Sequence, residues 1–147
     1  MQTSLKLLAF GALGSLPLTA CGAGLAPATA MATAPAAQAV ALFRIVKPDG
    51  AELGITLSDL HGLPAAQITV DGRVEDGPRL SDVLKLAGVT EFSEVTLTGS
   101  ASPITLTRAQ VDDNTILDFT NRGTMKLATT HVAKPDWTKD ITLVTVK

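Results

Sequence analysis

The chain has 147 residues, enough for one domain of ordinary size. Its 12 Lys and Arg residues against 14 Asp and Glu residues give a formal net charge of −2, so no basic surface predicts a nucleic-acid partner. The hydrophobic fraction of 46% is unevenly spread, since Lys6 is the only charged residue before Arg44. The chain therefore combines an apolar N-terminal part with a domain of mixed composition.

Residues 1–20 have the features of a secretory signal peptide. Lys6 supplies the positive charge, and the apolar run after it is too short to span a bilayer, which takes about 20 apolar residues. The run ends in Leu-Thr-Ala-Cys at 18–21, which resembles the lipobox of bacterial lipoproteins. Cys21, the only Cys in the sequence, stands where such proteins carry their lipid. We expect a lipoprotein signal peptide over 1–20 and lipidation at Cys21.

An ordinary signal peptide is the alternative, with a small-x-small cleavage site at 37–39, well beyond the apolar run. A lipoprotein Cys carries at least two acyl chains, which would hold the protein on a membrane without a transmembrane helix. Gly22 follows the Cys, where an Asp typically signals retention in the inner membrane of Gram-negative bacteria. The expected location is the cell envelope, at the outer membrane facing the periplasm if the organism is Gram-negative.

Residues 21–38 would then form the lipidated Cys and a tether. Small and uncharged residues dominate this stretch, which cannot bury an apolar face, and Pro27 and Pro35 oppose a helix. Residues 39–147 have the patterning of a folded domain. With Cys21 lipidated, that domain has no thiol for a disulfide, a metal or a nucleophile.

Two strands and a helical turn are predicted at the start of the domain. Residues 41–46 and 52–57 are strand candidates, separated by the turn sequence Lys-Pro-Asp-Gly at 47–50. Ser58 is the expected N-cap of a single helical turn over 59–61.

A hairpin is predicted next. Residues 67–70 alternate at period two, and Asp-Gly at 71–72 is typical of a type I′ turn, which would set Ile68 opposite Glu75. Because this pairing mixes an apolar and a charged side chain on one face, we expect the second arm to be an edge strand or a bulged one.

The main helix is predicted over 81–87, with Ser81 as its N-cap and Gly88 at its end. After it, the remaining strand candidates are 95–98, 104–107, 116–119, 125–127 and 141–146. Asn-Arg-Gly at 121–123 is a second hairpin signal, and the last run is β-branched, as suits a central strand. Many short strands with one main helix predict an α+β domain, mixed and mostly β.

Four segments of the domain also carry a family pattern. The run Gly-Ile-Thr-Leu-Ser-Asp-Leu-His-Gly-Leu-Pro at 54–64 fits "l-s-l-d-d-L-x-x-L-P", and 77–89 fits "G-v-x-L-x-d-v-L-x-x-A-G-v". Residues 115–123 are similar to "l-L-A-y-x-x-N-G", and Pro-Asp-Trp at 135–137 to "P-x-x-W" before the last strand. Together they make 39–147 resemble the molybdopterin-binding domain of the sulfite-oxidase-like oxidoreductases, in particular its small stand-alone envelope members.

The resemblance implies a molybdenum–pterin cofactor, which the catalytic members ligate through a Cys thiolate that this domain lacks. The family's "D-G-Y" is replaced by Gly-Ser-Ala at 99–101, and its "G-P-x-R-l-v" by Thr-Thr-His-Val-Ala at 129–133. We therefore expect a non-catalytic module that binds a small ligand or an envelope protein, with no resident cofactor. The alternative is a degenerate or accessory molybdopterin-dependent oxidoreductase that still binds a pterin.

The candidate binding residues are Arg79, His131 and Trp137. Arg is the side chain suited to an anionic phosphate, His131 stands in the segment that the resemblance places at the cofactor, and Trp137 could stack on a ligand. Burial of Trp137 as an anchor for the last strand is the interpretation that we favour.

No catalytic residue and no metal site are predicted. The two His residues lack metal-ligand spacing, and we expect His61 to be a surface residue of its turn. Asp-Asp-Asn at 112–114 lacks the loop length and bidentate Glu of a calcium site, so it is expected to form a turn.

Overall fold

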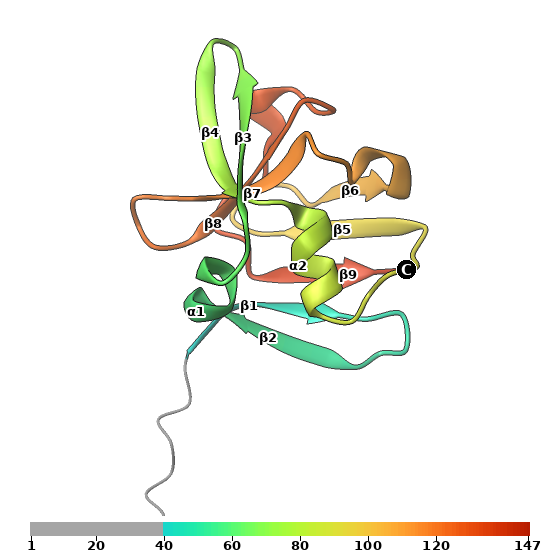
Figure 1. Cartoon of the computed structure of the whole chain (residues 1–147). Helices are drawn as coiled ribbons and strands as arrows, with labels where there is room; N and C mark the ends of the chain where they lie inside the picture. The colour runs from blue at the N-terminus through green and yellow to red at the C-terminus, as the bar shows by residue number, and fades with distance from the viewer. Residues whose placement is uncertain (1–39) are drawn as a thin grey trace, which may run out of the picture. The chain divides into compact units, whose positions relative to one another are not determined.

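The computed structural model describes residues 40–147; the predicted signal peptide, lipidation site at Cys21 and tether lie outside the described residues. Within 40–147 the chain forms nine strands, two α-helices and two 3₁₀ turns (Figure 1). This mixed, mostly β composition confirms the expected class. No helix in the same range is long and apolar enough to cross a membrane.

A five-stranded sheet forms the largest part of the fold. Its strands run in the order β2 (Glu52–Thr56), β1 (Ala41–Val46), β9 (Leu143–Val146), β5 (Glu94–Thr98) and β6 (Ile104–Thr107). β1 and β9 are parallel, and the other neighbours are antiparallel. The β-branched last run is therefore the central strand, as predicted, where side chains of this shape pack well on both faces.

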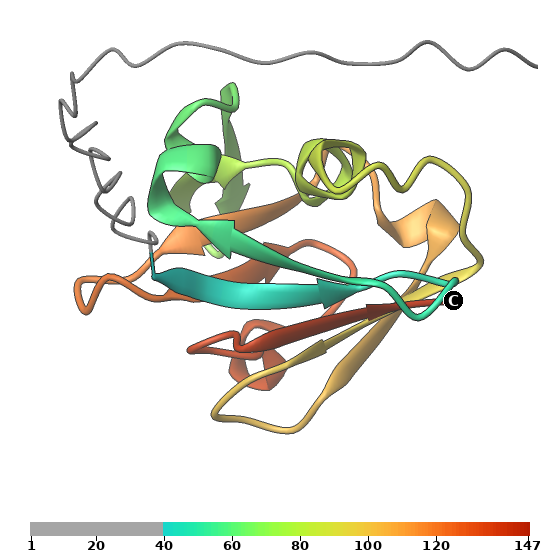
Figure 2. The same ribbon diagram turned by 90° about the horizontal axis from the view of Figure 1, so that it is seen from below.

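Helix α2 (Leu80–Leu86) packs against one face of this sheet, as Figures 1 and 2 show. Its buried side chains Leu80, Val83 and Leu84 share one core cluster with Phe43 and Ile45 of β1. The predicted main helix is thus confirmed with its bounds shifted by one residue.

The start of α2 differs from the prediction, and its end agrees with it. Ser81 lies in the first turn, while Arg79 holds the N-cap position without a capping side-chain bond, because burial of Leu80 starts the helix one residue earlier. At the other end Gly88 has φ +76°. Its amide donates to Lys85 O, and that of Val89 donates to Leu84 O, the two bonds of a Schellman motif.

The short helix α1 (Leu57–His61) begins at a different cap from the predicted Ser58. Thr56 Oγ1 accepts a bond from the Asp59 amide at 3.3 Å, and Asp59 Oδ2 accepts one from the Thr56 amide at 2.9 Å. This reciprocal capping box satisfies two backbone donors at once, which a Ser58 cap could not do. The side-chain hydrogen bond from Thr56 also lowers the pKa of Asp59.

Two hairpins complete the domain. In β3 (Ala65–Val70) and β4 (Arg73–Pro78), Asp71 has φ 51° and Gly72 φ 74°, the pattern of the predicted type I′ turn. Ile68 does face Glu75. The register is regular throughout, and β4 lies at the edge of a two-stranded sheet, so the edge-strand alternative is confirmed and no bulge is needed.

The second hairpin, β7 (Thr115–Phe119) and β8 (Met125–Thr129), turns at the predicted Asn-Arg-Gly, with φ 73° at Gly123. It lies close to the first one. A Cβ at Gly77 of β4 would overlap the carbonyl oxygen of Leu117 in β7. The hairpins therefore approach within backbone contact, which only a glycine at this position permits.

Candidate functional site

The structure places the candidates Arg79 and His131 beside the same turn. Arg79 Nε lies 3.0 Å from Asp113 Oδ1 without the alignment of a hydrogen bond, so the contact is an ion pair. His131 Nε2 lies 3.0 Å from Asp112 Oδ2. Each of the two candidate side chains therefore already has a carboxylate partner from the protein.

The turn at 112–114 is held by its own side chains, as expected of a turn. Asp112 Oδ1 accepts a bond from the Asn114 amide at 2.9 Å. Burial would raise the pKa of Asp112, but hydrogen bonds from His131 and Asn114 outweigh it and lower that pKa. No group of three metal-ligating side chains occurs within residues 40–147.

Trp137 lies between the two hairpins. Its side chain belongs to a second, smaller core cluster, is 2% exposed and donates from Nε1 to Val132 O at 3.0 Å. The other members of that cluster are Ala66, Ile68, Ile116 and Ala128. Trp137 therefore packs between β3, β7 and β8 rather than directly on the last strand.

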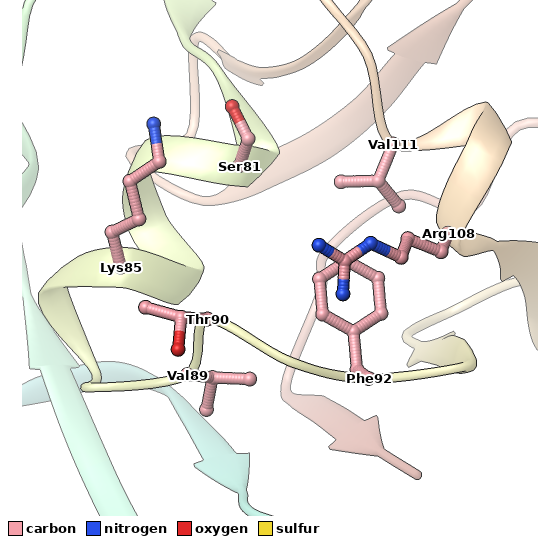
Figure 3. Close-up of a pocket in the computed structure, with 7 residues that line it drawn as sticks. All are labelled: Ser81, Lys85, Val89, Thr90, Phe92, Arg108 and Val111. Carbon is pink, nitrogen blue, oxygen red and sulfur yellow. The ribbon is translucent and has the colours of Figure 1, made fainter.

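A groove opens between helix α2 and the 3₁₀ turn η1 (Arg108–Gln110), with a cavity volume of about 240 Å³. Figure 3 shows α2 on one side, η1 on the other, and the loop that follows α2 along the bottom. Side chains of three kinds, namely cations, hydroxyls and apolar groups, line it. They are Lys85 and Arg108; Ser81 and Thr90; Val89, Phe92 and Val111.

Backbone bonds fix both ends of the loop at the bottom of this α2–η1 groove. The Schellman motif fixes its beginning at Gly88. At its end the Ser93 amide donates to Lys147 O at 2.6 Å, and Ser93 O accepts a bond from the Arg108 amide at 2.9 Å. Ser93 thus positions both Arg108 and the end of the loop, so the groove is largely pre-formed.

Two ion pairs border the groove. Arg108 Nη1 lies 2.6 Å from Glu91 Oε2, and its guanidinium carbon lies 5.5 Å from the centre of the Phe92 ring. Lys85 Nζ lies 3.0 Å from Asp82 Oδ1, one turn back on α2. Both cations are at least half exposed, so these pairs are solvated and weak.

A second hollow lies across the same loop. It is lined by Lys47, Pro48, Asp49, Gly88 and Glu91, and it shares Val89 and Thr90 with the first. This second hollow lies beside the turn between β1 and β2 and is separate from the α2–η1 groove.

The most strongly perturbed titrating groups lie elsewhere, in a charge network that joins the hairpins. Lys126 Nζ lies 2.7 Å from Glu75 Oε2 and 2.9 Å from Asp118 Oδ2, and Lys134 Nζ contacts Glu75 Oε1. Lys134 also lies 5.1 Å from the centre of the Trp137 ring. The network fills the space between β4, β7 and β8 and carries no net formal charge.

The pKa values of the two carboxyl groups in this network are shifted in opposite directions. Burial would raise the pKa of Glu75, but hydrogen bonds with Asp118, Lys126 and Lys134 hold it at about 2. Burial and the hydrogen bond with Glu75 raise the pKa of Asp118, against the effect of Lys126. For Lys126, burial favours the neutral amine, yet its two carboxylate partners raise its pKa. Lys126 thus remains a cation between its two carboxyl partners, which makes the network a structural one.

Sequence reasoning identified neither the groove nor the network. One signal did point to the network: the hairpin register set Glu75 opposite Ile68, on a face that packs inward. No comparable signal marked Arg108, which meets α2 only through the tertiary fold. His61 is exposed at its turn, as expected, with its ring 5.3 Å from that of Phe119.

The sequence matches no protein-family model, and no curated protein compared with it is significantly similar.

Proposed function

We propose that this protein is an envelope lipoprotein whose domain is a non-catalytic binding module held on the membrane through Cys21. The observation that carries the binding function is the α2–η1 groove. It is concave, its loop is fixed at both ends, and it combines apolar side chains with a few converging polar ones, the usual composition of a small-ligand site.

The side chains of the groove suit binding better than catalysis. A general base needs a side chain that is free to accept a proton, usually a His or a carboxylate, and a hydroxyl nucleophile needs such a base beside it. The α2–η1 groove presents one ammonium group, one guanidinium group and two hydroxyls. These groups orient a ligand and neutralise its charge.

We also propose that the domain is of the molybdopterin-binding type, with its cofactor function lost. An anionic pterin at Arg79 and His131 would have to displace Asp113 and Asp112, and Trp137 is too deeply buried to stack on a ligand. No Cys occurs in 39–147 to ligate molybdenum.

Analysis of the protein purified from its native host tests this proposal. We expect no stoichiometric molybdenum, no pterin fluorescence after denaturation, and a small organic molecule released on denaturation and detected by mass spectrometry. Stoichiometric molybdenum or pterin would overturn the proposal in favour of the degenerate or accessory oxidoreductase.

The anchor has its own test. In the Cys21→Ser variant we expect loss of the acyl mass and release of the protein from the membrane fraction. Membrane association at unchanged mass in this variant would contradict lipid anchoring, whatever the domain binds.

A further inference from the structure

We infer that the α2–η1 groove takes a small organic anion with an apolar body, a carboxylate or a phosphate monoester, whose charged group binds Arg108. The inference rests on the proposed binding function and names its ligand class.

Arg108 is held as a receptor for a planar anion. Its backbone amide is bonded to Ser93, and its guanidinium lies over the Phe92 ring at 5.5 Å from the ring centre, as Figure 3 shows, which favours this position of the fork. A planar guanidinium binds a carboxylate or phosphate through two parallel hydrogen bonds.

The protein's own Glu91 occupies that fork. Its two carboxylate oxygens lie 2.6 Å and 3.5 Å from Nη1 and Nη2 of Arg108. The Glu91 side chain is 84% exposed, and within 40–147 Arg108 is its only ion-pair partner, so it can swing into water at little cost. We interpret Glu91 as a stand-in that a ligand anion displaces.

The opposite wall adds hydrogen-bond donors, among them Lys85, whose charge is balanced by Asp82. Lys85 and Ser81 project from α2 along the groove, and Thr90 lies between the walls (Figure 3). The backbone amides of 90–92 donate to no protein group in the described part of the chain, so water or a ligand must satisfy them. A ligand anion would gain several donors at once.

The cavity limits the size of the ligand. Its apolar lining comes from Val89, Phe92 and Val111, and its volume of about 240 Å³ lies below the roughly 300 Å³ at which drug-sized sites begin. One ring or a short branched chain fits beside one anionic group, whereas a peptide or a nucleotide does not.

Benzoate, phenyl phosphate, inorganic phosphate and neutral benzyl alcohol are suitable probes. Each is titrated into the full chain purified in detergent, with the backbone amides of 88–92 followed by NMR. We expect benzoate or phenyl phosphate to bind at least about tenfold more tightly than benzyl alcohol, since a charge-assisted hydrogen bond is worth that much. If phenyl phosphate binds more tightly than benzoate, the ligand class is a phosphate ester. If benzoate binds more tightly, the ligand class is a carboxylate.

Variants test the role of Arg108. We expect Arg108→Ala to weaken anion binding about tenfold and Arg108→Lys, which keeps the charge but not the fork, to weaken it less. Glu91→Gln should strengthen binding, because it removes the competitor. The matched controls Arg44→Ala and Glu52→Gln alter another exposed Arg–Glu pair, on β1 and β2. They should leave anion binding unchanged.

Two results would overturn the inference. Equal binding of benzyl alcohol and benzoate would make the groove a site for apolar ligands, and unchanged anion binding in both Arg108 variants would place the anion elsewhere. Either result leaves the proposed binding function standing. Stoichiometric molybdenum in the native protein would overturn the proposed function itself.

Discussion

Replacement of Glu75 by Gln tests the charge network that joins the two hairpins. The variant keeps the shape of the side chain but removes the carboxylate that pairs with Lys126 and Lys134. The Glu75 side chain is 9% exposed, so water has little room to replace the lost charge. We expect the variant to have a lower free energy of unfolding at neutral pH, because two partly buried ammonium groups lose a partner.

The size of the loss follows from the pKa of Glu75. The protein holds this pKa at about 2 against an ordinary value of 4.5. Each pKa unit is worth about 1.4 kcal/mol, so ionised Glu75 contributes about 3 kcal/mol to stability at neutral pH. The variant also frees Asp118 from a neighbouring negative charge, and this effect offsets part of the lost stability. We therefore expect a net loss of about 2 kcal/mol.

The sign of the pH dependence is fixed. Because the pKa of Glu75 is lower in the folded protein than in the unfolded chain, its contribution is complete above about pH 5 and is lost as the pH falls towards about 2. The stability difference between the wild type and Glu75→Gln should follow the same course. Urea unfolding at a series of pH values, followed by the fluorescence of Trp137, the only Trp, measures it.

Glu52→Gln is the control, since Glu52 pairs with Arg44 at 3.5 Å on the exposed face of the sheet. We expect it to change stability by less than about 0.5 kcal/mol at every pH. A Glu75→Gln effect that stays constant between neutral and strongly acidic pH would refute the reasoning, because the loss would then come from packing and not from charge.

Two further substitutions test other parts of the fold. Gly77→Ala should lower the free energy of unfolding in urea by about 3 kcal/mol or more, because its Cβ overlaps the Leu117 carbonyl. Gly62→Ala is the control and should be near neutral, because its Cβ meets only ordinary contacts. Similar losses of stability in both variants would contradict the close approach of β4 and β7. His131→Ala should raise the pKa of Asp112 towards its ordinary value, because the hydrogen bond that opposes burial is removed. An NMR pH titration of that carboxyl carbon checks this, and an unchanged pKa would show that His131 does not hold the Asp112 carboxylate.

Local patterns predicted the fold elements well where the signal lies within a few residues. Asp71 and Gly72 predicted the turn and the register of the β3–β4 hairpin, and Gly88 predicted the end of α2. The caps were predicted less well. At α1 the prediction named Ser58, whereas Thr56 is the N-cap because it forms the reciprocal bond with Asp59.

The groove and the network could not be predicted, because their members meet only in the folded chain. Arg108 and Glu91 are separated by a whole hairpin, and Glu75 is 51 residues from Lys126. Sequence reasoning instead favoured Arg79 and His131 through a family pattern. In the structure each of these lies beside its own carboxylate.

The position of β9 also has a consequence for how the chain folds. This strand separates β1 from β5, and Arg44 pairs with Leu143 about 100 residues later in the sequence, a contact that is slow to form. Until residues 143–146 are available, the sheet is two separate hairpins, β1–β2 and β5–β6, with exposed inner edges. During synthesis the five-stranded sheet therefore stays incomplete until the residues of β9 have left the ribosome.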